Sequence, residues 1–374
     1  MYSKEEKARR LAAAAALIKA EGLQAIFLQG NGTVGGNSLG NYRYFVDNRT
    51  NFFIACAVIT PEGQLLGVVS SVMARNHLVK DSFVDNAIIS PDRLGGVIKY
   101  LKENGMDKGR LGVLLEVLPA SWLLRLRKEL PELQLVDVSD ALFAIRTQRS
   151  AEETGTLRRC GRIADEGCKA FEKAAVPGAM EHEVVADTIA AMQRCGCDNF
   201  FMLIASGRFS AEGSKMTTLH NAGGIDRRLE DGDTVSMEIT PYFNGNWTQL
   251  VRTVNVGRPN PDADEFIRVT KLGIRAAAAL IKPGVPISEL VKAMRSAVEA
   301  EGYRLAMPCG HICGADLNEE RLSEDNERRL LPGMCVIIHP TVLKGSLKSG
   351  IYWGESYLVT EDGCECLMPE STKD

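Results

Sequence analysis

Two polar side chains, Glu238 and Gln249, occupy the two arms of a predicted β-hairpin. Residues 232–253 alternate apolar and polar positions on the first arm and turn at Asn244-Gly245, a dipeptide that favours tight hairpin turns. A hairpin that served only as core would carry valines at positions 238 and 249. The pair therefore predicts a polar site on this hairpin, where a carboxylate lies near a neutral amide.

Four more polar residues in the second half of the chain could act at the same place: His220, His311, His339 and Glu355. A neutral imidazole can accept and return a proton near pH 7, and a carboxylate can orient water or a cationic group. Two acids clustered with two or three histidines would also titrate as a coupled set. These residue types favour general acid–base chemistry.

The motifs that carry these residues resemble the creatinase, prolidase and aminopeptidase P family, whose C-terminal domain has the pita-bread fold. The hairpin ends in Val251-Arg252-Thr253 where the peptidases of that family have Thr-Arg-Thr, and it is most similar to the hairpin of creatinase. The other matching segments are residues 218–221, 308–316, 332–340 and 352–363. The resemblance covers essentially residues 141–374 and implies the fold of this part.

In the metallopeptidases of this family five positions hold the metal ligands, and this chain departs from the pattern at three of them. Glu238 and Gln249 stand where two aspartates are expected, and His339 stands where a glutamate is expected. His311 and Glu355 match the expected histidine and glutamate. A neutral amide cannot give a negative charge to two cations, and a hydrolytic cation pair usually needs bridging carboxylates. The resemblance therefore implies a divergent member with an altered metal site.

The first function that this site predicts is a creatinase-like, metal-independent hydrolysis of a C–N bond in a small amidino, guanidino or amide substrate. The resemblance implies that His220 handles the proton at the scissile bond. Glu355 or Glu238 would orient water or a cationic group, and His339 or His311 would stabilise the developing oxyanion. We therefore expect no cofactor, catalysis by His220, Glu355 and His339, and substrate contacts from Glu238, Gln249 and His311.

Two alternatives remain open. His311, His339, Glu355 and Gln249 could hold one divalent ion, Zn²⁺, Mn²⁺ or Fe²⁺, which would make the chain a single-metal Xaa-Pro-type peptidase or a lyase. The chain could instead be a non-catalytic pita-bread protein used for binding. Retention of His220 and Glu355 counts against this last alternative, because a relict site usually fills with apolar residues.

Two tryptophans and two cysteines flank these positions. Trp247 and Trp353 could line the site for a flat or cationic substrate, or they could be ordinary packing residues. Cys309 and Cys313 lie two positions on either side of His311, so a thiolate nucleophile or a Cys/His zinc site is a further alternative. Small buried thiols in a reducing compartment are the simpler interpretation.

The elements that position this site are expected to form a second domain that follows an α/β domain. Residues 1–148 alternate strands and helices, which predicts a mostly doubly wound sheet. Ser150 and Glu153 have the spacing of a capping box that begins a long helix, which indicates a boundary here. The family resemblance implies that residues 1–148 are the creatinase/prolidase-like N-terminal domain and that residues 149–374 are the pita-bread domain. The first domain shows no phosphate loop or dinucleotide fingerprint.

Composition limits the partners. The 374 residues are 45% hydrophobic and 25% charged, with a net charge of −4, and no basic block indicates nucleic-acid binding. No apolar run approaches the roughly 18 residues of a membrane span. Ten cysteines, together with charges on both sides of the N-terminal alanine run, favour a reduced cytoplasmic protein without a signal peptide. We expect a small-molecule substrate and, from the family resemblance, a homodimer.

Overall fold

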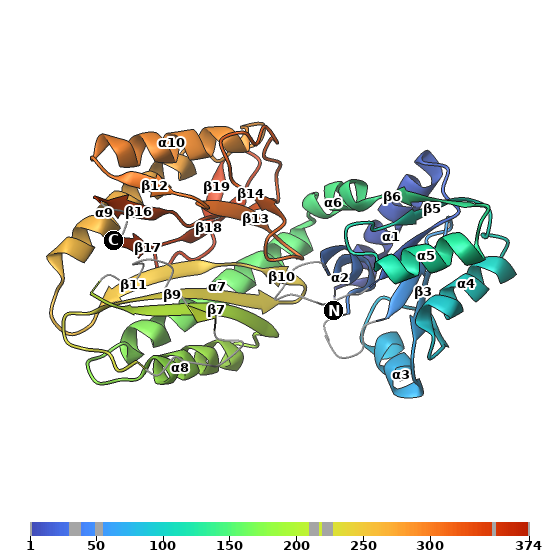
Figure 1. Cartoon of the computed structure of the whole chain (residues 1–374), viewed down its shortest axis with the longest axis horizontal. Helices are drawn as coiled ribbons and strands as arrows, with labels where there is room; N and C mark the ends of the chain where they lie inside the picture. Colours follow the sequence, from blue (N-terminus) through green and yellow to red (C-terminus); the bar gives the residue numbers. More distant parts are fainter. Residues whose placement is uncertain are drawn as a thin grey trace. The chain divides into compact units, whose positions relative to one another are not determined.

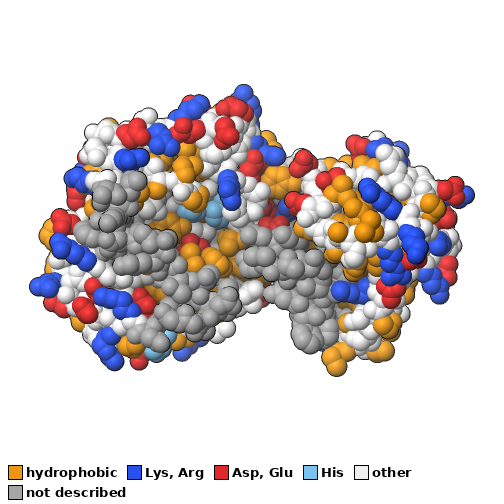
Figure 2. Space-filling view, viewed as in Figure 1, with side chains coloured by type: hydrophobic (Ala, Val, Ile, Leu, Met, Phe, Trp, Pro, Cys, Tyr) orange, Lys and Arg blue, Asp and Glu red, His pale blue; other side chains and the backbone are white. Residues whose placement is uncertain are grey.

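Two units make up the chain, Met1–Gln148 and Arg149–Asp374 (Figure 1). Each unit has hydrophobic clusters of its own. The structure, a computed structural model, describes residues 2–29, 39–48, 55–208, 217–218, 227–345 and 349–372. Within these ranges, no helix combines the length and the apolar character that crossing a bilayer requires. On the face drawn in Figure 2, basic and acidic side chains are interspersed, so neither sign of charge dominates that view.

The first unit alternates helices and strands. Its elements are α1 (Lys4–Ala20), β1 (Ala25–Gln29), α2 (Gly40–Val46), β2 (Cys56–Ile59), β3 (Leu65–Val69), α3 (Val72–Lys80), β4 (Asn86–Ile89), α4 (Arg93–Glu103), β5 (Gly109–Val113), α5 (Ala120–Glu129), β6 (Leu133–Asp137) and α6 (Ser139–Thr147). The strands that the structure describes here form one sheet in the order β4-β3-β2-β1-β5-β6. β2 is antiparallel to β1 and β3, and the other neighbours are parallel.

Helices cover both faces of this sheet. Alternate residues of β1 point to opposite sides, so Ile26 packs with α1, α2, α3 and α6, whereas Phe27 packs with α4 and α5. The predicted α/β class of the first domain is therefore confirmed, with β2 as the antiparallel member of a mixed sheet.

The second unit combines antiparallel sheets with four helices among its described residues. Its elements are α7 (Ala151–Ala174), α8 (Glu181–Arg194), β7 (Asn199–Gly207), β8 (Thr217–Thr218), β9 (Thr234–Phe243), β10 (Asn246–Trp247), β11 (Leu250–Asn255), α9 (Pro261–Ala278), α10 (Ile287–Ala300), β12 (Arg304–Ala306), β13 (Gly310–Cys313), β14 (Glu320–Arg321), β15 (Cys335–Ile338), β16 (Thr341–Lys344), β17 (Ser349–Tyr352), β18 (Glu355–Val359) and β19 (Cys364–Cys366). Ser150 caps α7 and forms the predicted capping box with Glu153.

The described residues of the second unit form three sheets. One has the order β10-β9-β7-β8 with β11 paired to β9, another has the order β14-β13-β15-β18-β19, and the third has the order β12-β16-β17. Apolar residues of α7 and α8 pack with β7, β9 and β11, whereas those of α9 and α10 pack with β13, β15, β16, β17 and β18. The sheets that hold the candidate site are thus backed by helices.

The hairpin that carries Glu238 forms as the sequence predicts. Asn244 and Gly245 have φ angles of 46° and 86°, the two left-handed residues that a type I′ turn requires. β9 is buried along nearly its whole length. Glu238 lies opposite Val251 of β11, so its carboxyl group is held inside the unit.

Candidate active site

Five polar side chains form a buried, hydrogen-bonded cluster in the second unit. The Tyr352 hydroxyl donates to Oε2 of Glu238 at 3.1 Å and lies 3.0 Å from Nδ1 of His339. Nε2 of His311 lies 3.2 Å from Oε1 of Gln249. The two imidazole rings are 5.2 Å apart between centroids. The structure therefore brings together four of the predicted site residues and adds Tyr352. We call these five residues the polar cluster.

Strand geometry explains how the polar cluster assembles. Glu238 is on β9, and Gln249 immediately precedes β11. The Ser356 hydroxyl anchors Gln249, because it accepts from the backbone N–H at 3.1 Å and donates to the backbone oxygen at 2.7 Å. His311 is on β13 and pairs with Ile337 of β15. β15 ends immediately before His339, so the two imidazoles lie on neighbouring strands.

Burial sets the protonation of the polar cluster. Loss of solvent raises the pKa of Glu238 to about 7, although hydrogen bonds from Tyr352 and Thr240 act in the opposite direction. Loss of solvent likewise lowers the pKa of His311 to about 4 and that of His339 to about 3. At neutral pH both imidazoles are therefore uncharged, and the Glu238 carboxyl is the member that changes its charge.

The hydrogen bonds also set where the protons lie. Since Tyr352 donates to Glu238, its hydroxyl oxygen is free to accept from Nδ1–H of His339, which leaves the lone pair of that ring on Nε2. When Glu238 takes up a proton and donates it to Tyr352, the hydroxyl turns and donates to Nδ1, and the ring hydrogen then belongs on Nε2. Protonation of Glu238 thus switches the tautomer of His339 without charging it.

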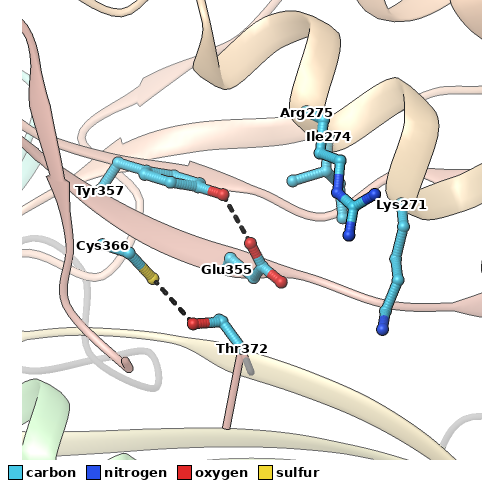
Figure 3. A pocket seen from close by; sticks show the side chains of 7 residues that line it. All are labelled: Lys271, Ile274, Arg275, Glu355, Tyr357, Cys366 and Thr372. Carbon is cyan, nitrogen blue, oxygen red and sulfur yellow. Dashed lines mark hydrogen bonds between the residues drawn. The ribbon is translucent and has the colours of Figure 1, made fainter. Parts of the chain in front are cut away.

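Glu355 does not join the polar cluster, contrary to the sequence prediction. Its Oε2 accepts a 2.5 Å hydrogen bond from Tyr357, and its Oε1 lies 3.4 Å from Nε1 of Trp353 and 3.6 Å from the Arg252 guanidinium. Glu355 and Tyr357 lie on the face of the sheet that packs against α9 (Figure 3). Successive strand residues point to opposite faces, so Ser356 faces Gln249 while Glu355 faces away from it.

Gly354, and not Glu355, is the residue that faces the polar cluster at the position where the sequence predicts a catalytic glutamate. A Cβ built on Gly354 would lie 2.6 Å from Cβ of His339, so this position points toward the polar cluster and supplies no side chain to it. The Gly354 backbone exchanges two 3.0 Å hydrogen bonds with Val251. The candidate glutamate is therefore displaced from the site by one residue, which on a strand means the other face.

Arg252 ties this region together. Its guanidinium donates to the backbone oxygens of Val251 at 2.8 Å, Gly354 at 2.9 Å and Ser371 at 2.7 Å. The side chain is 1% exposed. The arginine of the motif that carries the resemblance is thus a structural cation that joins the hairpin to Gly354, just before β18, and to Ser371.

The two tryptophans lie in different places. Trp353 is on the Glu355 face, where Arg252 lies 4.3 Å and Lys271 4.9 Å from its ring centroid, so the expectation that it lines the catalytic site is wrong. Trp247 packs on Tyr242 with ring centroids 4.8 Å apart and is 1% exposed. It is a core residue of the hairpin, and a substrate contact from it stays a prediction.

The cysteines beside His311 are buried thiols. Burial raises the pKa of Cys309 to about 12 and raises that of Cys313 well above its ordinary value. The Cys313 thiol donates to the backbone oxygen of Trp247 at 3.2 Å. These observations support the packing interpretation over a thiolate nucleophile.

The donor set does not fit the cation pair that the resemblance implies. Among the described residues there is no group of three or more His, Cys, Asp or Glu side chains that could hold a metal ion. Gln249 is neutral, position 354 has no side chain, and Glu355 faces away. His220 lies outside the described residues, so its place beside the polar cluster stays a prediction. The groups that are present suit proton transfer.

Sequence reasoning missed Tyr352, the residue that links Glu238 to His339. The signal was the alternation along residues 352–356: if Ser356 points inward, so do positions 354 and 352. Tyr352 ends β17 and Glu355 begins β18, and this break between two strands hides the alternation when the segment is treated as one strand.

Comparisons with known proteins identify both parts of the chain. Residues 155–361 match the model of metallopeptidase family M24, and residues 10–150 match the creatinase/prolidase N-terminal domain. The creatinase of Bacillus sp. strain B-0618 is 27% identical over 97% of this chain and 90% of its own length. The Xaa-Pro dipeptidase of Pyrococcus furiosus is 28% identical over 62% of this chain and 65% of its own length.

Solved structures agree on the fold. The prolidase from Pyrococcus horikoshii OT3 superposes with a TM-score of 0.81 at 21% identity, covering 96% of this chain and 97% of that one. The X-Pro aminopeptidase from Thermotoga maritima gives a TM-score of 0.83 at 18% identity, covering 96% of each chain. The predicted pita-bread fold of the second unit is confirmed. The chain belongs to metallopeptidase family M24, whose members hydrolyse C–N bonds, and carries a creatinase/prolidase N-terminal domain ahead of its peptidase domain.

Proposed function

We propose that this chain hydrolyses a C–N bond in a short peptide or peptide-like substrate, with the polar cluster moving the protons. The observation that carries the proposal is the hydrogen-bonded chain Glu238–Tyr352–His339, in which a carboxyl group has a pKa of about 7. A general base works best when its pKa lies near the working pH. Since the pKa of His339 is about 3, its ring cannot serve as base by becoming charged.

The relay through Tyr352 removes that obstacle. Nε2 of His339 takes a proton from water as the hydroxide adds to the substrate carbon, and Nδ1–H passes its proton to Tyr352, whose own hydroxyl proton moves to Glu238. When the C–N bond breaks, Nε2 returns a proton to the leaving nitrogen and the relay runs backwards. One water is consumed, the imidazole stays neutral throughout, and Glu238 ends as it began. His220 keeps the proton-handling role that the family resemblance implies.

The relatives favour a peptide substrate over an amidino one. Several of those that match are named Xaa-Pro dipeptidases, among them that of Pyrococcus furiosus, so a dipeptide with proline in second position is the first substrate class to test. The creatinase that matches nearly the whole chain supports small amidino and guanidino compounds as the second class. Both classes present a C–N bond to the same relay.

A second candidate function is a single-metal peptidase on the same scaffold. It is favoured by the family description as metallopeptidases and by the two imidazoles 5.2 Å apart. In that case His311, His339 and Gln249 would hold one ion that activates water as a Lewis acid. Glu355 no longer belongs to this donor set, because it lies on the other face of the sheet.

The test measures metal content and turnover together. Protein purified without chelator or histidine tag is analysed for metal and assayed on Xaa-Pro dipeptides, N-acyl amino acids and guanidino acids, with and without chelator. For the relay we expect turnover that survives chelation and a kcat about 10²-fold lower in Tyr352→Phe, the size typical of general acid–base catalysis. Tyr303→Phe, a buried tyrosine outside the polar cluster, is the matched control.

Two results would contradict the relay. Unchanged kcat in Tyr352→Phe would remove its central residue, and stoichiometric metal whose removal abolishes turnover would establish the single-metal candidate instead. His220→Ala tests the inferred second proton carrier. If it leaves kcat unchanged, the role implied by the resemblance is wrong for this chain.

A further inference from the structure

Tyr352 is held at both ends by the hairpin of β9 and β11. Its hydroxyl donates to Oε2 of Glu238 on β9, and its backbone oxygen accepts from the Thr253 hydroxyl of β11 at 2.6 Å. The Ser236 hydroxyl, also on β9, lies 2.6 Å from that of Thr253. Since a hydroxyl has one hydrogen to give and Thr253 gives its own to the backbone oxygen, Ser236 is the donor of this second bond. The tyrosine thus has a tie to the hairpin that is separate from its bond to Glu238.

The strand pairing beside Tyr352 explains why a side-chain hydroxyl holds its backbone. Val251 and Gly354 exchange two backbone hydrogen bonds of 3.0 Å in an isolated bridge. In a regular antiparallel ladder, the next pair to do so lies two residues further along each strand, which here is Thr253 and Tyr352. Because the bridge is isolated, the ladder does not extend to that pair. The Thr253 side chain supplies the donor that the ladder would otherwise give to the Tyr352 oxygen.

Burial makes this tie costly to lose. Ser236 is 0% exposed and Thr253 is 3% exposed, so water does not replace a hydroxyl that is removed. A buried acceptor without its donor keeps the full cost of its desolvation. The relay hydroxyl of Tyr352 lies 3.1 Å from Glu238 and 3.0 Å from Nδ1 of His339. Both of these hydrogen bonds depend on where the backbone of Tyr352 carries its ring.

We propose that Thr253 is a positioning residue: by holding the Tyr352 backbone oxygen, it keeps the Tyr352 hydroxyl between Glu238 and His339. The Thr253 hydroxyl contacts the Tyr352 backbone and Ser236, and not the atoms that exchange protons, so it acts on turnover through Tyr352. The inference rests on the proposed function, because it concerns the geometry of the same relay. A misplacement of about 1 Å can lower a rate by about 10²-fold.

Three variants test this role by kinetics. Thr253→Val removes the hydroxyl and keeps the branched shape of the side chain, whereas Thr253→Ser keeps the hydroxyl. The matched control is Thr188→Val, because the buried Thr188 hydroxyl also donates to a backbone oxygen, that of Val184 on α8, at 2.8 Å. We expect kcat to fall about tenfold in Thr253→Val with KM unchanged, and to stay near native in Thr253→Ser and Thr188→Val. Melting curves verify that each variant folds.

A double variant shows whether Thr253 acts through Tyr352. If it does, Thr253→Val causes no further loss of kcat when Tyr352→Phe is already present, since the hydroxyl that Thr253 positions is then absent. Residues that act as one unit give such non-additive effects. Losses that multiply in the double variant would mean that Thr253 acts by another route, and this result would overturn the proposal.

Nitrogen NMR of the imidazoles reads the position of the Tyr352 hydroxyl without turnover. In protein labelled with isotopic nitrogen in histidine, the Nδ1 signal of His339 reports its hydrogen bond to Tyr352, and its absence from His339→Gln assigns it. We expect Thr253→Val to move this signal in the same direction as Tyr352→Phe does, and Thr188→Val to leave it in place. An unmoved signal in Thr253→Val overturns the proposal.

The two readouts separate this inference from the relay itself. A moved His339 signal with native kcat in both Thr253→Val and Tyr352→Phe would support the positioning and contradict the proposed function. A moved signal with lower kcat in both variants supports the two together. A moved signal with lower kcat in Tyr352→Phe and native kcat in Thr253→Val would overturn the role of Thr253 in turnover.

Discussion

At Glu238 two environmental effects oppose each other, and the balance decides what the residue can do. Burial disfavours its charged form, whereas hydrogen bonds from Tyr352 and Thr240 favour it. The result is a pKa of about 7 instead of 4.5. A carboxyl group at the family's aspartate position thus gains the titration range usually supplied by histidine, while the two histidines of the polar cluster lose it.

This shift predicts a pH-dependent effect of Glu238→Gln on stability. The native state retains on Glu238 a proton that the unfolded chain releases between about pH 4.5 and 7, so this residue lowers the free energy of unfolding progressively over that window. A glutamine does not titrate, so the free energy of unfolding of the variant has no such decrease. We expect its stability relative to the native chain to rise by roughly 3 kcal/mol from pH 4.5 to 7 and then level off.

Urea unfolding at a series of pH values measures this difference. His311 and His339 act in the opposite direction, because their lowered pKa values make the chain more stable as the pH rises toward 6.5, but they are present in both proteins and cancel in the comparison. A difference that is the same at pH 4.5 and pH 7 would mean that Glu238 has an ordinary pKa.

At the residue scale, spacing within motifs carried most of the predictive power. Glu238, Gln249, His311 and His339 each follow a local pattern that fixes their place in the hairpin or at a strand end, and the structure brings them together. Glu355 was misplaced because its motif has a one-residue ambiguity, and on a strand one residue exchanges the two faces. Tyr352 carries no motif of its own, so only the alternation could have identified it.

The two faces of β18 have different surroundings. Ser356 holds Gln249 of the polar cluster, whereas Glu355 and Tyr357 line a cavity on the face that packs against α9. Such a division requires a small residue where the strand passes closest to His339, and Gly354 fills that place. A Cβ there would also lie 3.0 Å from Cα of His339 and 3.0 Å from the Ile338 oxygen.

Gly354→Ala is therefore expected to damage the polar cluster. The added methyl group meets backbone atoms that cannot turn aside, so we expect a loss of roughly 1–3 kcal/mol in stability and a fall in kcat. Gly363→Ala is the matched control, since its nearest atom would lie 4.0 Å away. Thermal melts and steady-state kinetics measure both. Native-like turnover in Gly354→Ala would contradict the placement of His339 against this glycine.

Element prediction succeeded where local chemistry was strong. The Asn244-Gly245 turn and the capping box at Ser150 and Glu153 follow from the residues alone, because each requires particular side chains or left-handed backbone. β16 and β17 were not predicted, because four residues are too few to show a period in the sequence. β17 pairs with β16, and β16 also pairs with β12. The hairpin of β2 and β3 follows from the Pro61-Glu62-Gly63 turn, whereas the antiparallel pairing of β2 with β1 depends on contacts distant in the sequence.

At the scale of the whole molecule, the two units have separate cores. Among the described residues, no hydrophobic cluster contains members from both sides of the boundary between Gln148 and Arg149. A unit with its own core and complete sheets is expected to fold by itself. The motifs that resemble the family were enough to predict the fold. They were not enough to predict the reaction, because the reaction depends on the positions that differ from the family pattern.

Expression of Arg149–Asp374 alone tests this independence. We expect a cooperative unfolding transition by circular dichroism, because every residue of the polar cluster and its backing helices lies within that unit. A fragment that unfolds without cooperativity would show that the second unit needs the first.

The predicted homodimer is measured on the full chain by sedimentation, and a monomer at micromolar concentration would contradict it.

The hydrogen bonds of Arg252 have a consequence for how the chain fluctuates. Its guanidinium holds the Ser371 oxygen, and the Ser371 N–H donates to Asp165 of α7 at 2.9 Å. A terminal segment normally frays with little cost. Here, release of Ser371 would leave the buried Arg252 guanidinium without one of its hydrogen-bond acceptors. The amide hydrogen of Ser371 should therefore exchange with solvent on the slow timescale of the central strands, and the turn that contains Ser371 should open only when the core does.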